Sequence, residues 1–186
     1  ASWSRWSYRY SPICQRHYSD GLAWKLFRQY LQLWRPQRHL ETPPFSLAAD
    51  VVFNDPSIGV PTHWLYGGTA EECRHSSADS IESVDSRALI DLAAAPLAMA
   101  YTMASVGNGA IPDLAIWNYS LSQERLRDDL QVFLDRSKEA RGLSDLNELI
   151  GEAARHFPLR AKMESEALLS LKQLGDNVEQ QLDWET

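Results

Sequence analysis

Hydrophobic and polar positions follow a helical period most clearly in residues 22–35. On a wheel of 100° per residue, the apolar side chains of this segment fill one half and the polar side chains fill the other. Pro36 ends the pattern, because proline disfavours helical backbone in the residue before it. The apolar half holds Ala23, Trp24, Leu26, Phe27, Tyr30, Leu31, Leu33 and Trp34, and the polar half holds Lys25, Arg28, Gln29, Gln32 and Arg35. The segment therefore predicts a basic amphipathic helix.

Residues 1–19 show no helical period. Their aromatic side chains, such as Tyr8 and Tyr10, alternate with Ser and Arg. Alternation of this kind is typical of an extended chain. We therefore expect an extended N-terminal arm, which becomes ordered only by lying on another surface.

The middle of the chain combines loops with one helix. Proline and glycine are dense between residues 36 and 68, which allows a short β element around 45–66. A helix is predicted over 82–104, with Pro96 kinking or dividing it. The uncharged run 92–112 is long enough to span a bilayer. Its proline, glycines and many alanines instead favour a buried helix followed by a turn, so no transmembrane helix is predicted.

The last third predicts three helices. Ser120 and Gln123 form a capping box, and Gly142 stands where a glycine commonly ends a helix. Ser144 begins a second helix, which Pro158 ends. The third runs over about 159–182 and carries the stripe Met163, Ala167, Leu171, Leu174, Val178 and Leu182. The predicted fold class is therefore mainly α, with a C-terminal three-helix region.

Three segments result from these patterns. Residues 1–38 are the basic aromatic arm with its amphipathic helix, 39–112 are a loop-rich acidic segment with a buried helix, and 113–186 are the helical region. The formal net charge of −7 conceals a sharp division between them. Residues 1–40 carry +6 and four of the seven tryptophans, whereas residues 39–186 carry −13.

Candidate chemistry is sparse. Cys14-x-x-His17 and Cys73-x-His75 could together hold zinc, but the second pair is spaced too tightly for a standard ligand pair. Two buried free thiols are favoured, and one disulfide in an oxidising compartment stays open. We therefore expect neither a metal nor a cofactor.

One neighbourhood is a candidate for an enzyme site. His63 lies in a loop that is rich in glycine and proline, within residues 50–75 and near four acids in sequence. These acids are Asp50, Asp55, Glu71 and Glu72. A general base needs an orienting partner and a nucleophile within reach. The chain contains no P-loop, H-E-x-x-H or G-x-S-x-G motif that would supply a nucleophile or metal. A small enzyme with a site in these loops is the alternative function, and a catalytic role is not the one that we expect.

The amphipathic helix has three interpretations: a core helix, a helix that docks on a protein partner, or a helix that lies on a membrane surface. Its polar face carries no acid and its apolar face carries four aromatic rings, which favours a role beyond the core. The residues expected to dock are Trp3, Trp6, Arg9, Trp24, Lys25, Phe27, Arg28, Tyr30, Trp34 and Arg35.

The sequence thus predicts a non-catalytic accessory or assembly subunit that binds other protein subunits of a larger complex, with membrane-surface contact. Residues 1–19 contain no acid and resemble the mature side of an organellar import signal, so we expect association with the mitochondrial inner membrane, in a respiratory-chain or ATP-synthase type of complex. A nucleic-acid-binding subunit that uses the basic aromatic arm is a further alternative. The acidic body would repel a polyanion, so nucleic acid is not the partner that we expect.

Overall fold

The computed structural model describes residues 5–11, 15–43, 53, 55, 57–67, 76–77 and 80–175. Four α-helices dominate it: α1 (Ser19–Trp34), α2 (Ser86–Ser105), α3 (Ile111–Glu139) and α4 (Leu143–Leu169). The described residues also contain three short 3₁₀ helices: η4 (Ile81–Ser83) before α2, η5 (Asn108–Ala110) between α2 and α3, and η6 (Ser170–Leu174) after α4. The strands are β1 (Arg5–Arg9), β2 (His39–Glu41) and β3 (Trp64–Gly67). The predicted mainly α fold class is confirmed.

The N-terminal segment forms the middle strand of a small sheet rather than a free arm. The strand order is β2-β1-β3, with β2 parallel and β3 antiparallel to β1. Trp6 and Tyr8 are both 0% exposed, so the alternation seen in the sequence does reflect an extended chain with one buried face. A short β element was expected around 45–66, and β3 lies at the end of that range. Residues 44–52 lie outside the described residues. Strand β2 was not predicted.

Helix α1 packs on that buried face of the sheet. The ring of Tyr8 meets Phe27 edge-on at 4.6 Å between centroids, and Trp6 stacks on Tyr30 at 5.8 Å. Aromatic pairs prefer such offset or edge-on arrangements, and they add to the stabilisation from burial. The helix predicted over residues 22–35 is therefore a core helix, because side chains of its apolar half are buried against the sheet and the rest of the core.

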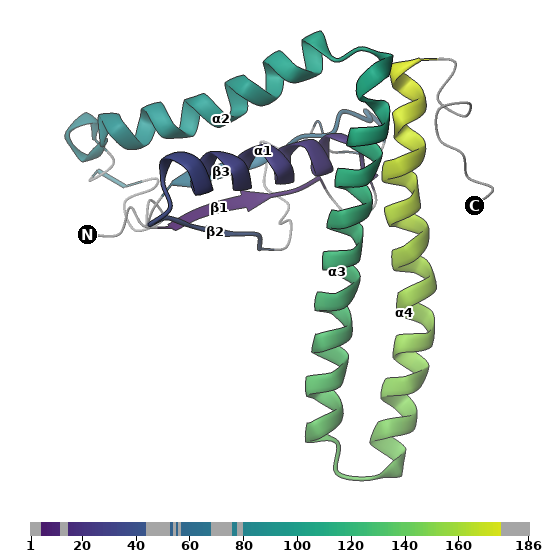
Figure 1. The fold of residues 1–186 in the computed structure, drawn as a ribbon. Helices are drawn as coiled ribbons and strands as arrows, with labels where there is room; N and C mark the ends of the chain where they lie inside the picture. The colour runs from purple at the N-terminus through teal and green to yellow at the C-terminus, as the bar shows by residue number, and fades with distance from the viewer. Residues whose placement is uncertain are drawn as a thin grey trace.

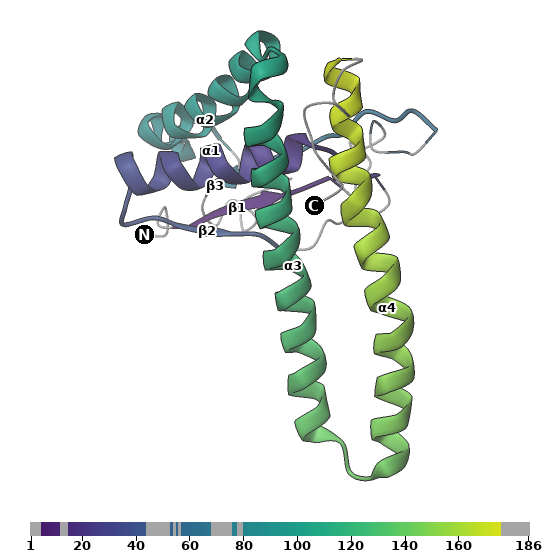
Figure 2. The ribbon, with the colours of Figure 1, turned by 45° about the vertical axis from the view of Figure 1, so that its right-hand side comes forward.

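Helix α2 forms a third layer over α1, and the two helices lie side by side in Figures 1 and 2. The side chain of Asp85 caps its start by accepting from the backbone N–H groups of Arg87 and Ala88. Pro96 lies inside the helix and does not divide it. Tertiary packing compensates for this proline, because Ala95 and Met99, on either side of Pro96, are buried against the body.

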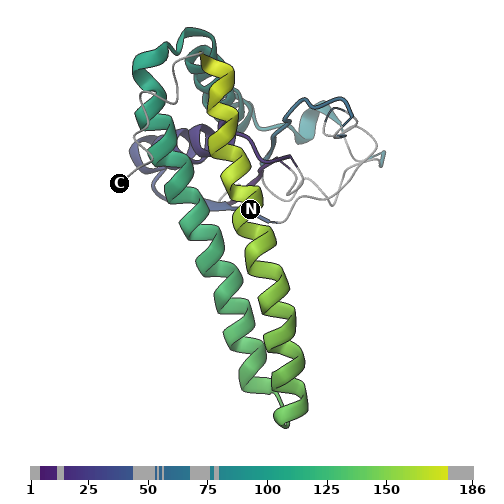
Figure 3. The ribbon, with the colours of Figure 1, turned by 90° about the vertical axis from the view of Figure 1, so that its right-hand side faces the viewer.

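Helices α3 and α4 form a long hairpin that stands across the layered body and projects well beyond it (Figures 1 and 3). The predicted break between helices at Gly142 and Ser144 lies close to the end of α3 and the start of α4, but the other helix boundaries predicted here were wrong. Ser120 lies inside α3, Gly142 is the residue before α4, and α4 continues through Pro158. Packing between the helices outweighs these local signals. The ring of Phe157, next to that proline, packs against the ring of Phe133 of α3, with 5.5 Å between the ring centroids. Residues 176–182 of the expected third helix lie outside the described residues.

A single buried cluster joins the three predicted segments. It is drawn from β1 and α1, from α2, and from α3 and η6. Its members with the largest side chains include Trp6, Tyr8, Phe27, Met99, Ile111, Leu114 and Leu171. Strand β1 and helix α1 are thus part of the core that the rest of the chain surrounds.

Candidate functional site

The aromatic residues predicted to dock divide into buried and exposed ones. Trp6 and Phe27 are fully buried against this chain, so their surface is not open to a partner in this conformation. Trp24 and Tyr30 are half-buried and donate hydrogen bonds to Glu124 and Asp91. Trp34, at the C-terminal end of α1, is 65% exposed, and Trp3 lies outside the described residues.

The basic residues predicted to dock contact acids of this chain. Arg28 binds Glu124 of α3 at 2.6 Å. Arg35 binds Asp91 of α2 at 2.7 Å, and Tyr30 and Arg38 contact the same carboxylate. Arg9 and Lys25 are half-buried. Most of the charge that suggested an external partner is therefore used inside the fold.

A buried ionic cluster ties the body to the hairpin. Asp20, at the start of α1, is 0% exposed and accepts from Ser11 at 2.8 Å and from Arg125 of α3 at 3.1 Å. Arg125 also binds Glu164 of α4 at 3.0 Å, and Arg16 lies between the two carboxylates. Charges buried in this way are stable only when paired, so the cluster is a structural joint.

The charges of the cluster shift one another's titration. Burial alone would raise the pKa of Asp20, but Arg125, Arg16 and the hydrogen bond from Ser11 together hold it below its ordinary value. Burial and the nearby guanidinium of Arg125 lower the pKa of Arg16 to about 10. Asp20 thus stays ionised at neutral pH, which matches its role as the centre of the cluster.

His63, the residue singled out in the sequence, lies against the start of α1. Its Nε2 is 2.8 Å from the hydroxyl of Ser19, and its Nδ1 is 2.6 Å from the hydroxyl of Tyr8 and 3.5 Å from Asp20. Of the four acids expected near it, only Asp55 lies in the described residues. Asp55 is exposed and accepts a hydrogen bond from Ser57 instead. Asp50, Glu71 and Glu72 lie outside the described residues.

The serine, histidine and aspartate have a triad-like spacing, but the geometry does not fit nucleophilic catalysis. Ser19 is only 1% exposed, so a substrate carbonyl cannot reach its Oγ in this conformation. The N–H of Asp20 is bonded to the carbonyl of His17, and the N–H of Gly21 to Asn118. Donors that could stabilise an oxyanion are thus already in use at this helix start.

No metal site emerges from the part of the chain that the structure describes. It contains no group of three His, Cys, Asp or Glu side chains placed to hold an ion. Cys14, Cys73 and His75 lie outside the described residues. His17 is engaged by Ser19 and Gln173. At the hairpin tip, acids line a hollow of about 290 Å³, where Arg136 binds Glu152 through two hydrogen bonds.

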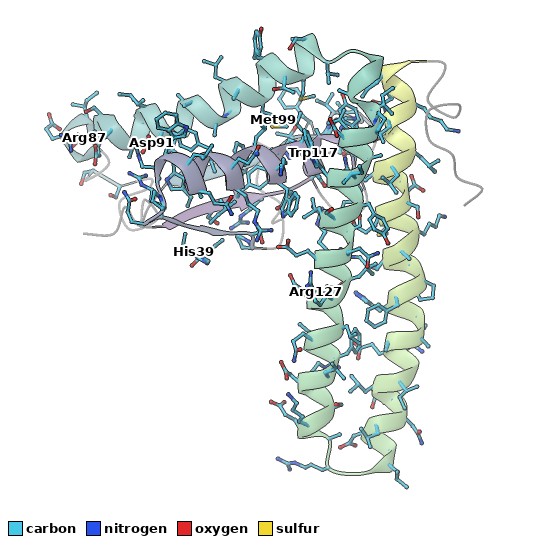
Figure 4. All side chains as sticks on the ribbon, in the orientation of Figure 1. His39, Arg87, Asp91, Met99, Trp117 and Arg127 are labelled. Carbon is cyan, nitrogen blue, oxygen red and sulfur yellow. The ribbon has the colours of Figure 1, made fainter. Side chains whose placement is uncertain are left out.

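The largest feature that sequence reasoning missed is the outer face of α2. We define it as Leu89, Ile90, Ala93, Leu97, Ala100, Tyr101 and Ala104, all of them exposed. Figure 4 shows Asp91 and Met99 on the opposite side of the helix, towards α1. The sequence predicted a buried helix here because a mostly apolar, alanine-rich segment shows little contrast between its two faces. Only Ala88, Asp91, Ala95 and Met99 are buried.

By length and composition, α2 is the one helix in the described chain that could cross a membrane. Core helices of soluble proteins pass the same criterion, although such helices are mostly buried. In α2, only 22% of the most apolar window is buried within this chain.

Comparison of the chain with protein-family models, with curated protein sequences and with solved structures finds no match.

Proposed function

We propose that this protein is a non-catalytic accessory or assembly subunit that docks onto other protein subunits of a larger, membrane-associated complex. The observation that carries the proposal is the outer face of α2, an uncharged apolar surface that runs along a 20-residue helix. This face replaces the N-terminal arm as the principal docking surface.

The outer face exposes large apolar side chains as a continuous stripe. Ile90 is 66% exposed, Leu97 is 69% exposed and Tyr101 is 73% exposed. Single exposed apolar residues are ordinary on a soluble protein, but a contiguous uncharged patch is typical of a binding surface. Contact between this stripe and water is unfavourable. A partner that covers the stripe therefore stabilises the complex through the burial of each apolar side chain.

The spacing of the stripe favours a helix as the partner surface. Ile90, Ala93, Leu97, Ala100 and Ala104 follow one another in steps of 3, 4, 3 and 4 residues. This is the spacing of a coiled-coil seam, in which side chains of one helix fit between those of another. Alanine in the seam allows the two helix axes to approach closely.

Two observations favour a protein over lipid on this face. Helices that lie in a membrane interface carry several Lys or Arg residues, whereas α2 contains only Arg87. Small side chains such as alanine also favour contact with another helix, because they let the two helix backbones pack closely. Membrane contact is assigned instead to the end of α1, where Leu33 and Trp34 are exposed. The mitochondrial inner membrane remains our proposed location on the composition of residues 1–19 alone.

The alternative of nucleic acid finds no open stacking surface at Trp6 and Tyr8 of β1, the described aromatic residues of the expected arm on that strand. Bases bind single-stranded sites by stacking on open aromatic rings. Trp6 and Tyr8 are fully buried, and Arg28 and Arg35 are paired with acids.

The test is the native mass of the assembly that contains this chain. We expect Leu97→Glu with Tyr101→Glu to leave the helical circular dichroism and the Tm unchanged, because both side chains are exposed, and to release the chain from its assembly. The matched control is Leu143→Glu with Ile150→Glu at the hairpin tip, where the side chains are 80% and 65% exposed. The control should keep the native mass. An α2 variant that stays in the assembly would refute the proposal.

A further inference from the structure

Four buried or half-buried polar side chains and the exposed Gln173 form a hydrogen-bonded relay around the start of α1. The order is Tyr8 of β1, His63 before β3, Ser19 of α1, His17 before α1, and Gln173 of η6. The four distances along it are 2.6, 2.8, 2.8 and 3.0 Å. The relay therefore connects parts of the fold that are distant in sequence.

With both rings neutral and the amide oxygen of Gln173 facing His17, the relay has one consistent proton order. The amide oxygen of Gln173 can only accept, so His17 must donate from Nε2, and its Nδ1 is left as an acceptor. The backbone N–H and the hydroxyl of Ser19 both point to that Nδ1, at 3.2 and 2.8 Å. With its hydrogen used, the Ser19 oxygen accepts from Nε2 of His63. Nδ1 of His63 then accepts the hydroxyl hydrogen of Tyr8.

We propose that this relay is an acid-sensitive latch, in which protonation of His17 or His63 loosens η6 and the segment before β3 from the start of α1. A protonated His17 carries a hydrogen on Nδ1, which then faces the backbone N–H of Ser19. Two donors in contact repel, and Ser19 N–H loses its acceptor. A protonated His63 likewise carries a hydrogen on Nδ1, where it meets the hydroxyl hydrogen that Tyr8 donates. The latch is thus closed only while both rings are neutral.

The surroundings of the rings favour the neutral form. His63 faces Tyr8 and Asp20, with His17, Arg125 and Arg16 near it. Burial lowers its pKa, the attraction of Asp20 opposes this, and the three other groups reinforce it. Burial likewise lowers the pKa of His17, against the hydrogen bond to Gln173 and the attraction of Asp20. Asp20 cannot neutralise a new cation fully, because Ser11, Arg125 and Arg16 already bind it.

The direction of the pH effect follows from these shifts. The folded protein holds the histidines below their ordinary pKa of about 6.5, so the unfolded chain binds more protons. The stabilisation is complete above that ordinary value and is lost as the pH falls through and below it. Asp20, whose pKa is lowered, titrates at more acidic pH, so its loss does not overlap with this range.

Two measurements test the latch. In histidine ¹⁵N spectra of the intact protein at pH 7.5, we expect both rings to be neutral and to carry hydrogen on Nε2. A ring with hydrogen on Nδ1, or a charged ring, would overturn the proton order and the proposal. This measurement needs no variant, so it decides even if substitutions at these positions prevent folding.

The second measurement is hydrogen exchange between pH 7.5 and 5.5, corrected for the intrinsic rate at each pH. Protection in η6 and the first turn of α1 should fall by about tenfold or more, and the Tm should fall by about 4 °C or more. The double variant His17→Asn with His63→Gln keeps hydrogen-bonding groups that do not titrate, so it should lose this pH dependence. The control His39→Gln, at an exposed position, should keep it. Equal protection at both pH values, or a pH effect that persists in the double variant, would overturn the latch.

Discussion

At the scale of single residues, the contact between α1 and α3 depends on a glycine. A Cβ at Gly21 would lie 2.6 Å from both the backbone nitrogen and Cγ of Asn118. Asn118 is itself buried and bonds the carbonyls of Tyr18 and Leu114 with its amide. The close crossing of the two helices therefore requires Gly at this position.

We expect Gly21→Ala to lower the free energy of unfolding by about 2–3 kcal/mol, because neither helix backbone can move aside cheaply. Urea unfolding measures the change. The matched control is Gly151→Ala on α4, where the new Cβ would meet only Arg155 at 3.6 Å. That substitution should stabilise the helix by about 0.5–1 kcal/mol. Equal effects of the two variants would contradict the tight crossing.

A second prediction concerns the centre of the ionic cluster. Asp20→Asn leaves Arg125 and Arg16 buried with less compensating charge, so it should destabilise the protein by about 3–5 kcal/mol. Arg136→Ala, which breaks an exposed pair with Glu152, should have no comparable effect in the same unfolding experiment. If Asp20→Asn unfolds at the wild-type urea concentration, the cluster is not a structural joint.

The burial of some of these residues could be predicted from the sequence, whereas the contacts of others could not. The alternation of Trp6, Tyr8 and Tyr10 was visible, and it correctly marked an extended chain. Its partners could not be found in the same way, because Asp20 meets Arg125 across 105 positions of the chain. A buried charge and an exposed one look alike in a sequence until the fold supplies the contact.

At the scale of elements, α2 is held to the body by one charged contact and by an apolar inner face. Asp91 is 0% exposed and binds Tyr30 and Arg35 at the end of α1, with Arg38 at 3.3 Å. Burial opposes its ionisation, but these partners hold the pKa of Asp91 below its ordinary value. The remaining inner face offers small residues, such as Ala88 and Ala95, so it contributes less per turn than α1 does.

We therefore expect Asp91→Ala to loosen α2 more than the rest of the protein. Hydrogen exchange should show α2 amides that exchange at least about tenfold faster, with β1 and α3 changed less. Asp128→Ala, at an exposed position of α3, is the control and should leave α2 unchanged. Uniform acceleration throughout the chain would show instead that α2 is an inseparable part of the core.

The helices also show where local signals mislead. The segment at 22–35 was found within a few residues because its two faces differ strongly. Ser120 and Pro158 were taken as helix boundaries, yet they lie inside α3 and α4. Long-range packing in the hairpin decides these boundaries, and a local motif carries no record of it.

At the scale of the whole molecule, the division of charge is resolved within the chain. Basic side chains of the N-terminal segment lie among acids of the body, as in the contacts of Arg28 with Glu124 and of Arg35 with Asp91. The charge pattern that suggested an external partner is largely internal complementarity. Among the described residues, the uncharged surfaces that remain open to a partner include the outer face of α2 and the exposed ring of Trp34.

The central claim is that a partner covers the outer face of α2, and cysteine labelling tests it most directly. Leu97→Cys is placed in a chain whose Cys14 and Cys73 are replaced by Ser, and Leu143→Cys in the same background is the control. A maleimide should label both positions rapidly in the isolated chain, because both side chains are exposed. In the native assembly, we predict at least about tenfold slower labelling at position 97 and unchanged labelling at position 143. Equal labelling of position 97 in the assembly and in the isolated chain would contradict the account.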